Sequence, residues 1–300
     1  MELTPETVVL ITGASSGIGA AAARRFAQEG VRLAIAARRR ESLEAIAADA
    51  QRLGSTVLVV PTDVTDPEQA RRLVQTTLEH FGQIDVLINN AGRGNLASVE
   101  GTTPEQLWSI FAVNAFSLWY VAAPALPHMK ARRQGHIIVI ASVAGKWGYP
   151  YCSAYVAAKH AAVGFVAALR TELLETGVEA TVLCPAAVDT EWGLVTEGGP
   201  LGVLFQEGIR HSKEIARSRE IPLAPLPKVL SAEAVAEQLV ELVRHPDRAD
   251  VFTHPGTAEL AILVAQDRRA FEGKMMPFYL GVRQAYEDWR AHVGKDSSVL

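Results

Sequence analysis

Short runs of apolar residues, many of them β-branched, alternate with longer stretches of helical character along much of the chain. The runs predict strands at residues 7–12, 32–37, 56–60, 84–88, 136–141 and 179–184. Helices are predicted between them, at 18–28, 41–53, 67–81 and 154–176. Four of the strands are nearly all apolar, which is expected when helices cover both faces of a sheet.

The repeated strand–helix–strand units predict the fold class. Such units connect through right-handed crossovers and produce a parallel sheet. We therefore expect an α/β protein with a doubly wound parallel sheet, a Rossmann fold, with helices on both faces. The sequence shows no internal repeat and no break in composition, so residues 1–300 are expected to form a single domain.

Two regions have a less regular pattern. Residues 191–229 are rich in Gly and Pro and show no clear period, so we expect an irregular segment that serves as a substrate lid. The pattern becomes helical again over residues 256–300, with Leu260, Leu263 and Val264 at helical spacing. This C-terminal extension could cover the core, bind a second subunit or cap the substrate site.

Composition narrows the classes of function. The chain has 49% hydrophobic and 21% charged residues and a net charge of −4, so no basic field is expected to attract nucleic acid. The N-terminus has no signal-peptide pattern, and the most apolar stretch, 115–126, is too short to span a bilayer. Cys152 and Cys184 form no metal-ligand spacing with histidines, so no metal site is predicted. We expect a soluble, cytoplasmic protein.

The first predicted strand leads directly into a glycine-rich turn, Thr12-Gly13-Ala14-Ser15-Ser16-Gly17-Ile18-Gly19, which opens the next helix. Glycines allow a tight turn and close approach of the backbone to a pyrophosphate, toward which the helix directs its free N–H groups. The alternative is a plain tight turn. The position between a clear strand and a clear helix favours the phosphate site.

The glycine spacing, Gly-x-x-x-Gly-x-Gly, is similar to that of the short-chain dehydrogenase/reductase family. Further elements of that family follow in order: Asn89-Asn90-Ala91-Gly92, Asn114, Ser142, and the pair Tyr155-x-x-x-Lys159. The resemblance covers roughly residues 6–190. It implies an oxidoreductase that transfers a hydride between a nicotinamide cofactor and a carbonyl or alcohol carbon. The cofactor-binding residues that it implies are Gly13, Ser15, Ser16, Gly17, Ile18, Gly19, Asn90, Ala91, Gly92, Tyr155, Lys159, Pro185, Val188 and Thr190.

Three consecutive arginines bear on the choice of dinucleotide. An NAD site usually has an acid at the end of the second strand to bind the ribose 2′-hydroxyl, and this chain has none there. A guanidinium binds a 2′-phosphate bidentately, which a carboxylate would repel. We therefore predict NADP(H), with Arg38 as the phosphate ligand. Arg39 or Arg40, and the Ser15 hydroxyl, would assist; a solvated basic patch is the alternative.

Asp63 and Val64 follow the third strand. By resemblance, the Asp63 side chain would bind the adenine amino group and the Val64 backbone would support it. An equally good reading makes Asp63 a turn residue.

Tyr155 and Lys159 lie four residues apart on a predicted helix, so they share one face. A free tyrosine has a pKa near 10, and a neighbouring ammonium would favour the phenolate. Tyr155 would then act as general acid or base. The resemblance implies that Ser142 binds the reacting oxygen, that Lys159 binds the nicotinamide ribose, and that Asn114 supports the lysine through a proton path.

The sequence departs from the family pattern after the sixth strand, where Pro185 is followed by Ala186 instead of glycine. Alanine resists positive φ, so the nicotinamide edge of the site is expected to differ slightly. An apolar, bulky substrate is suggested by nearby aromatic and aliphatic residues, which could equally pack the lid onto the body: Trp147, Tyr149, Tyr151, Trp192, Leu194, Leu204 and Phe205. Cys152 could border the pocket, but packing is the simpler role.

Three other functions are weighed against an NADP(H)-dependent reductase or dehydrogenase. An NAD-dependent alcohol dehydrogenase is disfavoured by the arginines. A non-catalytic NADP(H)-binding redox sensor is disfavoured because all four proton-relay residues are present. Nucleotide-sugar epimerase or dehydratase chemistry is disfavoured by the glycine spacing. The family resemblance also implies a homodimer or homotetramer.

Overall fold

The computed structural model describes residues 1–193, 196–224, 226–246 and 248–296. Its centre is a seven-stranded, fully parallel sheet with the order β3-β2-β1-β4-β5-β6-β9. The strands are β1 (Val8–Thr12), β2 (Arg32–Ala37), β3 (Val57–Pro61), β4 (Val86–Asn89), β5 (Gly135–Ile140), β6 (Val178–Cys184) and β9 (Asp250–Phe252). The predicted fold class is confirmed. The order of strands reverses between β1 and β4, which is where ligands bind in sheets of this kind.

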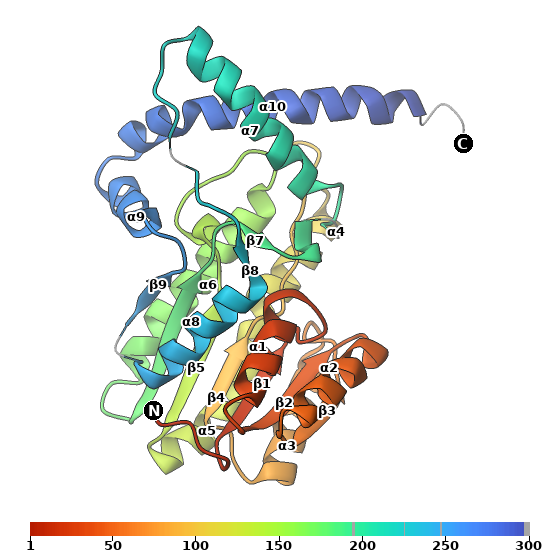
Figure 1. The fold of residues 1–300 in the computed structure, drawn as a ribbon, viewed down its shortest axis with the longest axis vertical. Helices are drawn as coiled ribbons and strands as arrows, with labels where there is room; N and C mark the ends of the chain where they lie inside the picture. Colours follow the sequence, from red (N-terminus) through yellow and green to blue (C-terminus); the bar gives the residue numbers. More distant parts are fainter. Residues whose placement is uncertain (194–195, 225, 247, 297–300) are drawn as a thin grey trace.

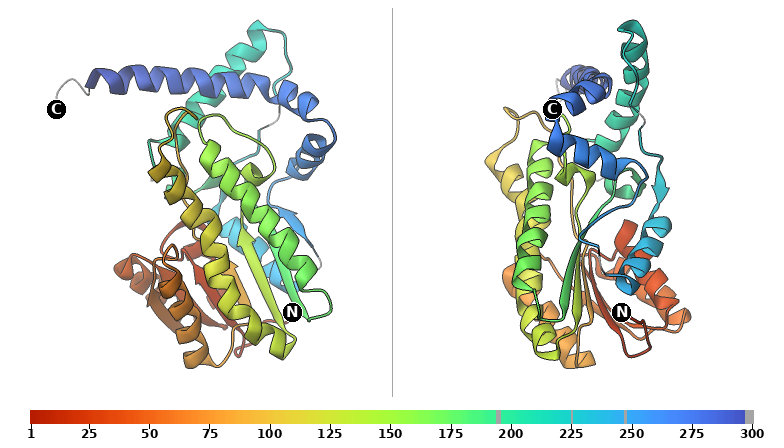
Figure 2. Two further views of the ribbon diagram at one scale, coloured as in Figure 1. Left: turned by 180° about the vertical axis from the view of Figure 1, so that it is seen from behind. Right: turned by 90° about the vertical axis from the view of Figure 1, so that its left-hand side faces the viewer.

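Helices cover both faces of the sheet (Figure 2). On one face lie α1 (Gly17–Ala27), α2 (Arg40–Arg52) and α8 (Ala232–Arg244). On the other lie α3 (Pro67–Phe81), α5 (Ser117–Arg132) and α6 (Ser153–Glu172). Successive residues of β1 alternate between the two cores, because side chains along a strand point to opposite faces. Burial on both faces explains why the strands are apolar throughout.

Local signals in the sequence fix the ends of several helices. The Asp66 carboxylate caps α3 by accepting from the backbone N–H groups of Glu68 and Gln69, and Gly82 ends the helix with φ 80°. A capping box at Thr103 starts α4 (Pro104–Phe111). The predicted end of α6 at residue 176 is wrong, since the helix ends at Glu172 and a turn follows.

The expectation of an irregular segment over residues 191–229 is wrong for its central part. Residues Leu201–Ser218 form an 18-residue helix, α7, which packs against the long C-terminal helix α10 (Arg268–Asp296). The two helices cross above the carboxyl edge of the sheet (Figure 1). They meet at glycines: a Cβ on Gly281 would lie 2.2 Å from the Gly208 carbonyl oxygen. The apolar residues Leu201, Leu204, Phe205 and Ile209 do recur at helical spacing, but Gly- and Pro-rich stretches on both sides obscure this period in the sequence.

The remaining elements are short or peripheral. Two-residue strands β7 (Val188–Asp189) and β8 (Leu230–Ser231) pair with each other, and α9 (Thr257–Gln266) links β9 to α10.

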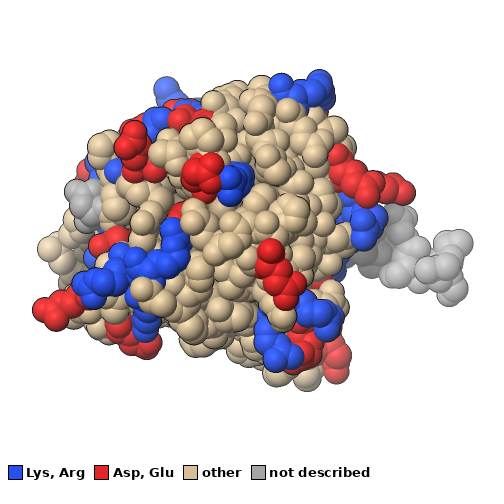
Figure 3. Space-filling model, turned by 90° about the horizontal axis from the view of Figure 1, so that it is seen from below, with Lys and Arg blue, Asp and Glu red and all other residues tan. Residues whose placement is uncertain are grey.

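The stretch Pro104–Arg132 is long and apolar enough to cross a membrane, but half of its most apolar 18-residue window is buried within the fold, so it is no clear membrane span. On the face shown in Figure 3, acidic and basic side chains are interspersed.

Candidate active site

The glycine turn after β1 is held against the loop after β4. The Asn90 side-chain amide donates to the carbonyl oxygens of Thr12 and Gly13, at 3.0 and 3.1 Å. The Thr12 hydroxyl in turn accepts from the backbone N–H groups of Asn90 and Ala91, at 3.0 and 3.2 Å. A Cβ on Gly13, which has φ 65°, would lie 2.8 Å from the Ala91 Cα. Only glycine therefore allows the two loops to approach this closely.

The first turn of α1 can bind an anion through its backbone N–H groups and the positive end of the helix dipole. Ser16 is the N-cap residue, its side chain makes no capping hydrogen bond, and the first turn contains no acid. Gly17 has φ 54°, and a Cβ there would lie 3.2 Å from the Thr190 Cγ2. The structure thus places Thr190, which is far away in the sequence, beside the glycine turn.

All three arginines after β2 are exposed, but their surroundings differ. The Arg39 guanidinium donates to the Ser15 hydroxyl at 3.3 Å, so it reaches back over the glycine turn. Arg40 pairs with Glu44 at 3.6 Å, and Arg38 makes no hydrogen bond or ion pair with the described residues. The structure therefore brings Arg39 and Ser15 together and leaves Arg38 free beside them.

Asp63 is engaged in a local turn. Its Oδ1 accepts from the backbone N–H and the hydroxyl of Thr65, at 3.0 and 2.7 Å, while its own N–H donates to Gln69. The turn role is therefore present in the structure. The Val64 side chain is buried against the sheet.

Ser142, Tyr155 and Lys159 gather at the carboxyl edge of the sheet. Ser142 follows β5, and its hydroxyl accepts from the Ala144 N–H at 3.1 Å and donates to the Pro185 carbonyl at 3.4 Å. Tyr155 lies in the first turn of α6, and Lys159 follows one turn later. The two side chains belong to residues that are 8% and 5% exposed, and the Lys159 Nζ lies 5.7 Å from the centre of the Tyr155 ring.

Burial shifts the pKa values of these two groups in opposite directions. It raises the pKa of the Tyr155 phenol, and a hydrogen bond with Ser142 offsets part of that rise. It lowers the pKa of Lys159 to about 8. The lysine donates to the Ile140 carbonyl at 2.9 Å, which helps to hold the ammonium within the fold. Tyr155 is consequently protonated at neutral pH and can act as a proton donor.

Asn114 lies in a single π-helical turn, Ala112–Phe116, between α4 and α5. Its amide donates to the carbonyls of Arg93 and Ile110 at 2.8 and 2.9 Å, and its Oδ1 accepts from the Arg93 N–H at 3.3 Å. A Cβ on Gly92 would lie 2.9 Å from that Oδ1 and 3.4 Å from the Lys159 Nζ. Asn114 therefore fixes the loop after β4 directly beside the lysine, with only the glycine between them.

The same loop connects the segment around Glu197 to the start of α6, the helix that carries Tyr155. Asn95 Oδ1 accepts from the Tyr155 backbone N–H at 2.9 Å. On the other side of the loop, Glu197 exchanges backbone hydrogen bonds with Gly94 and Leu96, and its carboxylate pairs with Arg93 at 3.2 Å. Sequence reasoning missed Arg93, Asn95 and Glu197, because no local motif marks them.

The 185–190 loop, which follows β6, carries the remaining predicted cofactor residues. Ala186 does not adopt positive φ, so the alanine fits where glycine was expected. The Pro185 carbonyl accepts from the Val143 N–H at 2.9 Å, and Val188 pairs with Leu230 in the short β7–β8 sheet. The predicted residues Pro185, Val188 and Thr190 therefore lie on one path from Ser142 to the glycine turn.

Comparison with known proteins agrees with this geometry. A family model described as short chain dehydrogenase matches residues 7–195. The chain belongs to the short-chain dehydrogenase family. It is 38% identical over 192 residues to the dehydrogenase/reductase SDR family protein 7-like of Anopheles gambiae, over 62% of this chain and 61% of that protein. It is 33% identical over 244 residues to the bovine (Bos taurus) dehydrogenase/reductase SDR family member 7B, over 78% of this chain and 75% of that protein.

Solved structures of the family have the same fold. A short-chain dehydrogenase/reductase from Burkholderia phymatum in complex with NAD has a TM-score of 0.75 at 26% identity, over 90% of this chain and 96% of that one. An alcohol dehydrogenase from the archaeon Thermococcus sibiricus, complexed with 5-hydroxy-NADP, has a TM-score of 0.69 at 29% identity, over 84% and 97%. The chain is thus a short-chain dehydrogenase/reductase and an oxidoreductase, and these neighbours bind nicotinamide dinucleotides of both kinds.

Aromatic side chains cover Tyr155 in this member of the short-chain dehydrogenase family. The Trp192 ring lies over Tyr155 with 5.1 Å between ring centres, and Tyr151 stacks on Tyr286 of α10 at 3.8 Å. Leu204 is buried in the same cluster. The C-terminal extension therefore contributes to the cover over the site.

Trp147 plays the packing role instead. It is buried against Phe271 of α10, with 5.5 Å between ring centres. Tyr149 and Phe205 pack on each other at 5.7 Å. Leu194 lies outside the described residues. Cys152 is buried and donates weakly to the Tyr149 carbonyl, and burial raises the pKa of its thiol to about 12, which agrees with a packing role.

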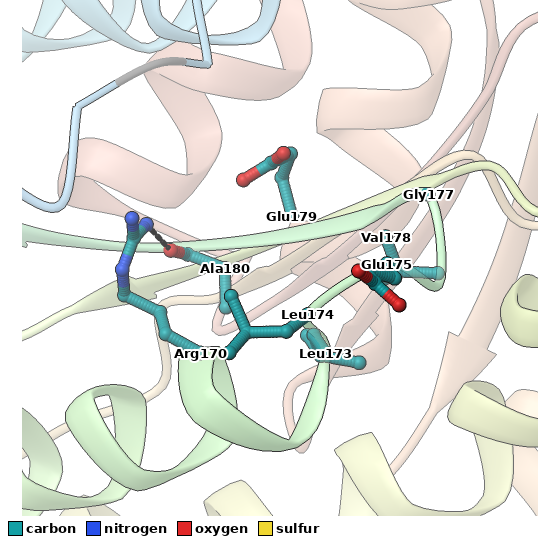
Figure 4. A pocket seen from close by; sticks show the side chains of 8 residues that line it. All are labelled: Arg170, Leu173, Leu174, Glu175, Gly177, Val178, Glu179 and Ala180. Atoms are coloured by element: carbon teal, nitrogen blue, oxygen red, sulfur yellow. Dashed lines mark hydrogen bonds between the residues drawn. The ribbon is translucent and has the colours of Figure 1, made fainter.

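Two surface hollows lie away from this site. One, of about 350 Å³, surrounds the turn between α6 and β6, where Arg170 donates to the Ala180 carbonyl at 2.7 Å (Figure 4). The other, of about 490 Å³, is an apolar groove between α5 and α6, which includes Trp119 and Phe165. Neither contains a predicted catalytic or cofactor residue.

Proposed function

We propose that this oxidoreductase uses NADP(H) to interconvert a carbonyl compound and a primary or secondary alcohol, with Tyr155 as general acid and base. One observation carries the proposal: Tyr155, Lys159 and Ser142 lie together at the carboxyl edge of the sheet, on the path that the 185–190 loop follows back to the glycine turn. A proton donor and a dinucleotide-type phosphate site next to each other are what hydride transfer to a carbonyl requires.

The residues present fit a dinucleotide. The glycine turn carries no side chain at Gly13, Gly17 and Gly19, and the start of α1, which has no side-chain cap, suits a pyrophosphate. The turn from Gly13 to Gly19, the Asn90–Gly92 loop and Thr190 would hold the two phosphates and the adjoining riboses. Lys159 would bind the hydroxyls of the nicotinamide ribose.

The preference for NADP(H) depends on the arginines. Arg39 lies against the Ser15 hydroxyl, and Arg38 is free to turn toward the same place. Together they would hold a 2′-phosphate, whereas an NAD site would need an acid after β2. The solved relatives carry either NAD or an NADP derivative, so they do not distinguish between the two cofactors for this chain. The predicted preference therefore rests on the arginine side chains.

The nicotinamide ring, when bound, supplies or accepts the hydride. The phenol of Tyr155 donates its proton to the substrate oxygen in reduction, and the Ser142 hydroxyl binds the same oxygen. Lys159 is positioned by the Ile140 carbonyl to favour the phenolate that remains. Burial keeps the phenol protonated before the reaction but also opposes the loss of its proton, and the positive charge of Lys159 would offset part of that opposition.

The cover over Tyr155 supports an apolar substrate. Trp192, Leu204 and the Tyr151–Tyr286 stack offer apolar surface and few charges near the phenol. A flat or bulky apolar ketone or aldehyde suits such a surface.

The test is the oxidation of NADPH, and separately of NADH, followed by absorbance against aldehydes and ketones of increasing size. We expect turnover with NADPH, lowered by at least about 100-fold in Tyr155→Phe. Tyr120→Phe, on α5, is the matched control and should retain activity. Tight NADPH binding without turnover of any carbonyl would favour the redox-sensor alternative, and equal use of NADH would contradict the predicted preference.

A further inference from the structure

A buried histidine in the C-terminal part of the chain contacts the 185–190 loop. His254 follows β9, and the register of β6 and β9 places Phe252 opposite Cys184. Because the strands are parallel, the residues after them leave the same edge of the sheet side by side. His254 is 3% exposed, and the proposed chemistry above gives it no role.

The hydrogen bonds of the imidazole fix its protonation state. Nε2 lies 3.0 Å from the Ala187 carbonyl oxygen, which can only accept, so Nε2 carries a proton. Nδ1 lies 3.3 Å from the Ala186 N–H, which can only donate, so Nδ1 carries none. The Thr253 hydroxyl also reaches Nδ1, at 2.6 Å. These partners require the neutral Nε2–H tautomer.

The surroundings favour the neutral form as well. Burial lowers the pKa of His254, and hydrogen bonds to the backbone at Ala187 and Lys228 offset only part of that change. The histidine main chain is also fixed, since its carbonyl accepts from the Thr257 hydroxyl at 2.6 Å. A rigid donor and a rigid acceptor thus face the backbone of two successive residues of the loop, Ala186 and Ala187.

These two residues lie between Pro185, whose carbonyl accepts from Ser142, and Val188, which begins the path to Thr190. The imidazole therefore sets the direction in which the backbone leaves β6. We propose that His254 is a positioning residue for the cofactor: it fixes the 185–190 loop in the conformation that receives the nicotinamide half of the dinucleotide. This inference rests on the proposed function.

The test is calorimetric titration of the full chain with NADPH and, separately, with 2′,5′-ADP, which lacks the nicotinamide half. We expect His254→Ala to weaken NADPH binding about tenfold while 2′,5′-ADP binding changes by less than about twofold. His136→Gln is the matched control. His136 is 1% exposed and bonds Thr181 at 2.9 Å, but it lies at the other end of the strands, so both affinities should be retained.

Unchanged NADPH affinity in His254→Ala, or an equal loss for both ligands, would overturn the inference alone. A wild-type chain that binds neither ligand would contradict the proposed function itself. A second measurement needs no variant: nitrogen-15 NMR of the wild-type imidazole near neutral pH should show the Nε2–H tautomer for His254. A charged ring or the Nδ1–H tautomer would overturn the inference even if His254→Ala fails to fold.

Discussion

Tyr155 and Lys159 show how one buried environment acts on two ionisable side chains. Water is excluded from both, so the neutral phenol and the neutral amine are each favoured over their charged forms. The sequence predicts the helical spacing that brings the two residues together. From that spacing alone, the expected effect is that the Lys159 ammonium lowers the pKa of the Tyr155 phenol. The degree of burial, which opposes that effect, depends on Trp192 and α10 and could not be read from the motif.

The lowered pKa of Lys159 predicts a pH dependence of stability. Between about pH 8 and its unfolded value near 10.5, the unfolded chain binds more protons at this lysine than the folded chain, so the free energy of unfolding rises with pH. Below pH 8 the folded lysine is protonated too, and this contribution is constant. Denaturant unfolding from pH 7 to pH 10 should show the free energy of unfolding of wild type increase relative to that of Lys159→Met above about pH 8, because the other titrating groups are common to both proteins. Parallel curves would contradict the pKa shift.

Arg39 gives a prediction about dinucleotide choice. Arg39→Asp removes a guanidinium beside Ser15 and places a carboxylate there, so it should lower the ratio of kcat/KM for NADPH over NADH by at least about tenfold. Arg40→Ala is the control, because Arg40 pairs with Glu44 on its own helix. Steady-state kinetics with both cofactors would measure the ratio. An unchanged ratio in Arg39→Asp would mean either that Arg38 alone binds the 2′-phosphate or that the enzyme does not prefer NADPH.

At the scale of elements, the loop after β4 joins three functional segments. It contacts the glycine turn through Asn90, the π-helical turn through Asn114, and the first turn of α6 through Asn95. The motif residues Asn90 and Asn114 were predicted from the sequence. Asn95 was not, because a single polar residue in a loop carries no periodic signal, and its partner lies 60 residues away.

The segment proposed as the substrate lid is attached to this loop by Glu197, which pairs with Arg93 and accepts from the Ser109 hydroxyl at 3.0 Å. Glu197→Gln removes the charge from a partly buried ion pair with Arg93, which contributes about 1 kcal/mol to holding the segment in place. KM for the carbonyl should therefore rise about fivefold while kcat stays within about twofold. Glu191→Gln, on an exposed residue of the same segment, is the control. A fall in kcat with unchanged KM would show that the contact serves catalysis rather than lid closure.

In the molecule as a whole, two segments that are distant in the sequence together cover the candidate active site. Residues 191–218 follow β6, and α10 lies near the C-terminus, yet the two helices α7 and α10 cross at Gly208 and Gly281. Gly281→Ala should force them apart, lower the free energy of unfolding by about 1–3 kcal/mol and raise KM. Gly273→Ala, on the same helix with open space around its Cβ, should be neutral or stabilising. Thermal unfolding of both variants would measure the change in stability, and steady-state kinetics would measure the change in KM.

The apolar groove between α5 and α6 bears on assembly, for which we propose a homodimer or homotetramer. Trp119 is 48% exposed there, beside Phe165. Trp119→Glu should lower the molar mass measured by light scattering during gel filtration, because a charge would be buried at the interface. Leu174→Glu, on an exposed leucine outside the groove, is the control. A monomeric wild type would contradict the proposed assembly.

The parallel sheet, the glycine turn and the capped ends of α3 can be predicted from the sequence alone, and the catalytic roles of Asn114, Ser142, Tyr155 and Lys159 stay predictions. These follow from contacts between residues near in the chain, or from a motif whose geometry is local: side-chain alternation, helical spacing, and the conformations open to glycine and proline. Only the folded chain reveals the contacts of Arg39 with Ser15, of Trp147 with Phe271, of Trp192 with Tyr155, and of His254 with Ala186 and Ala187. Each of these depends on segments brought together across the sheet, and such contacts leave no period or spacing in the sequence.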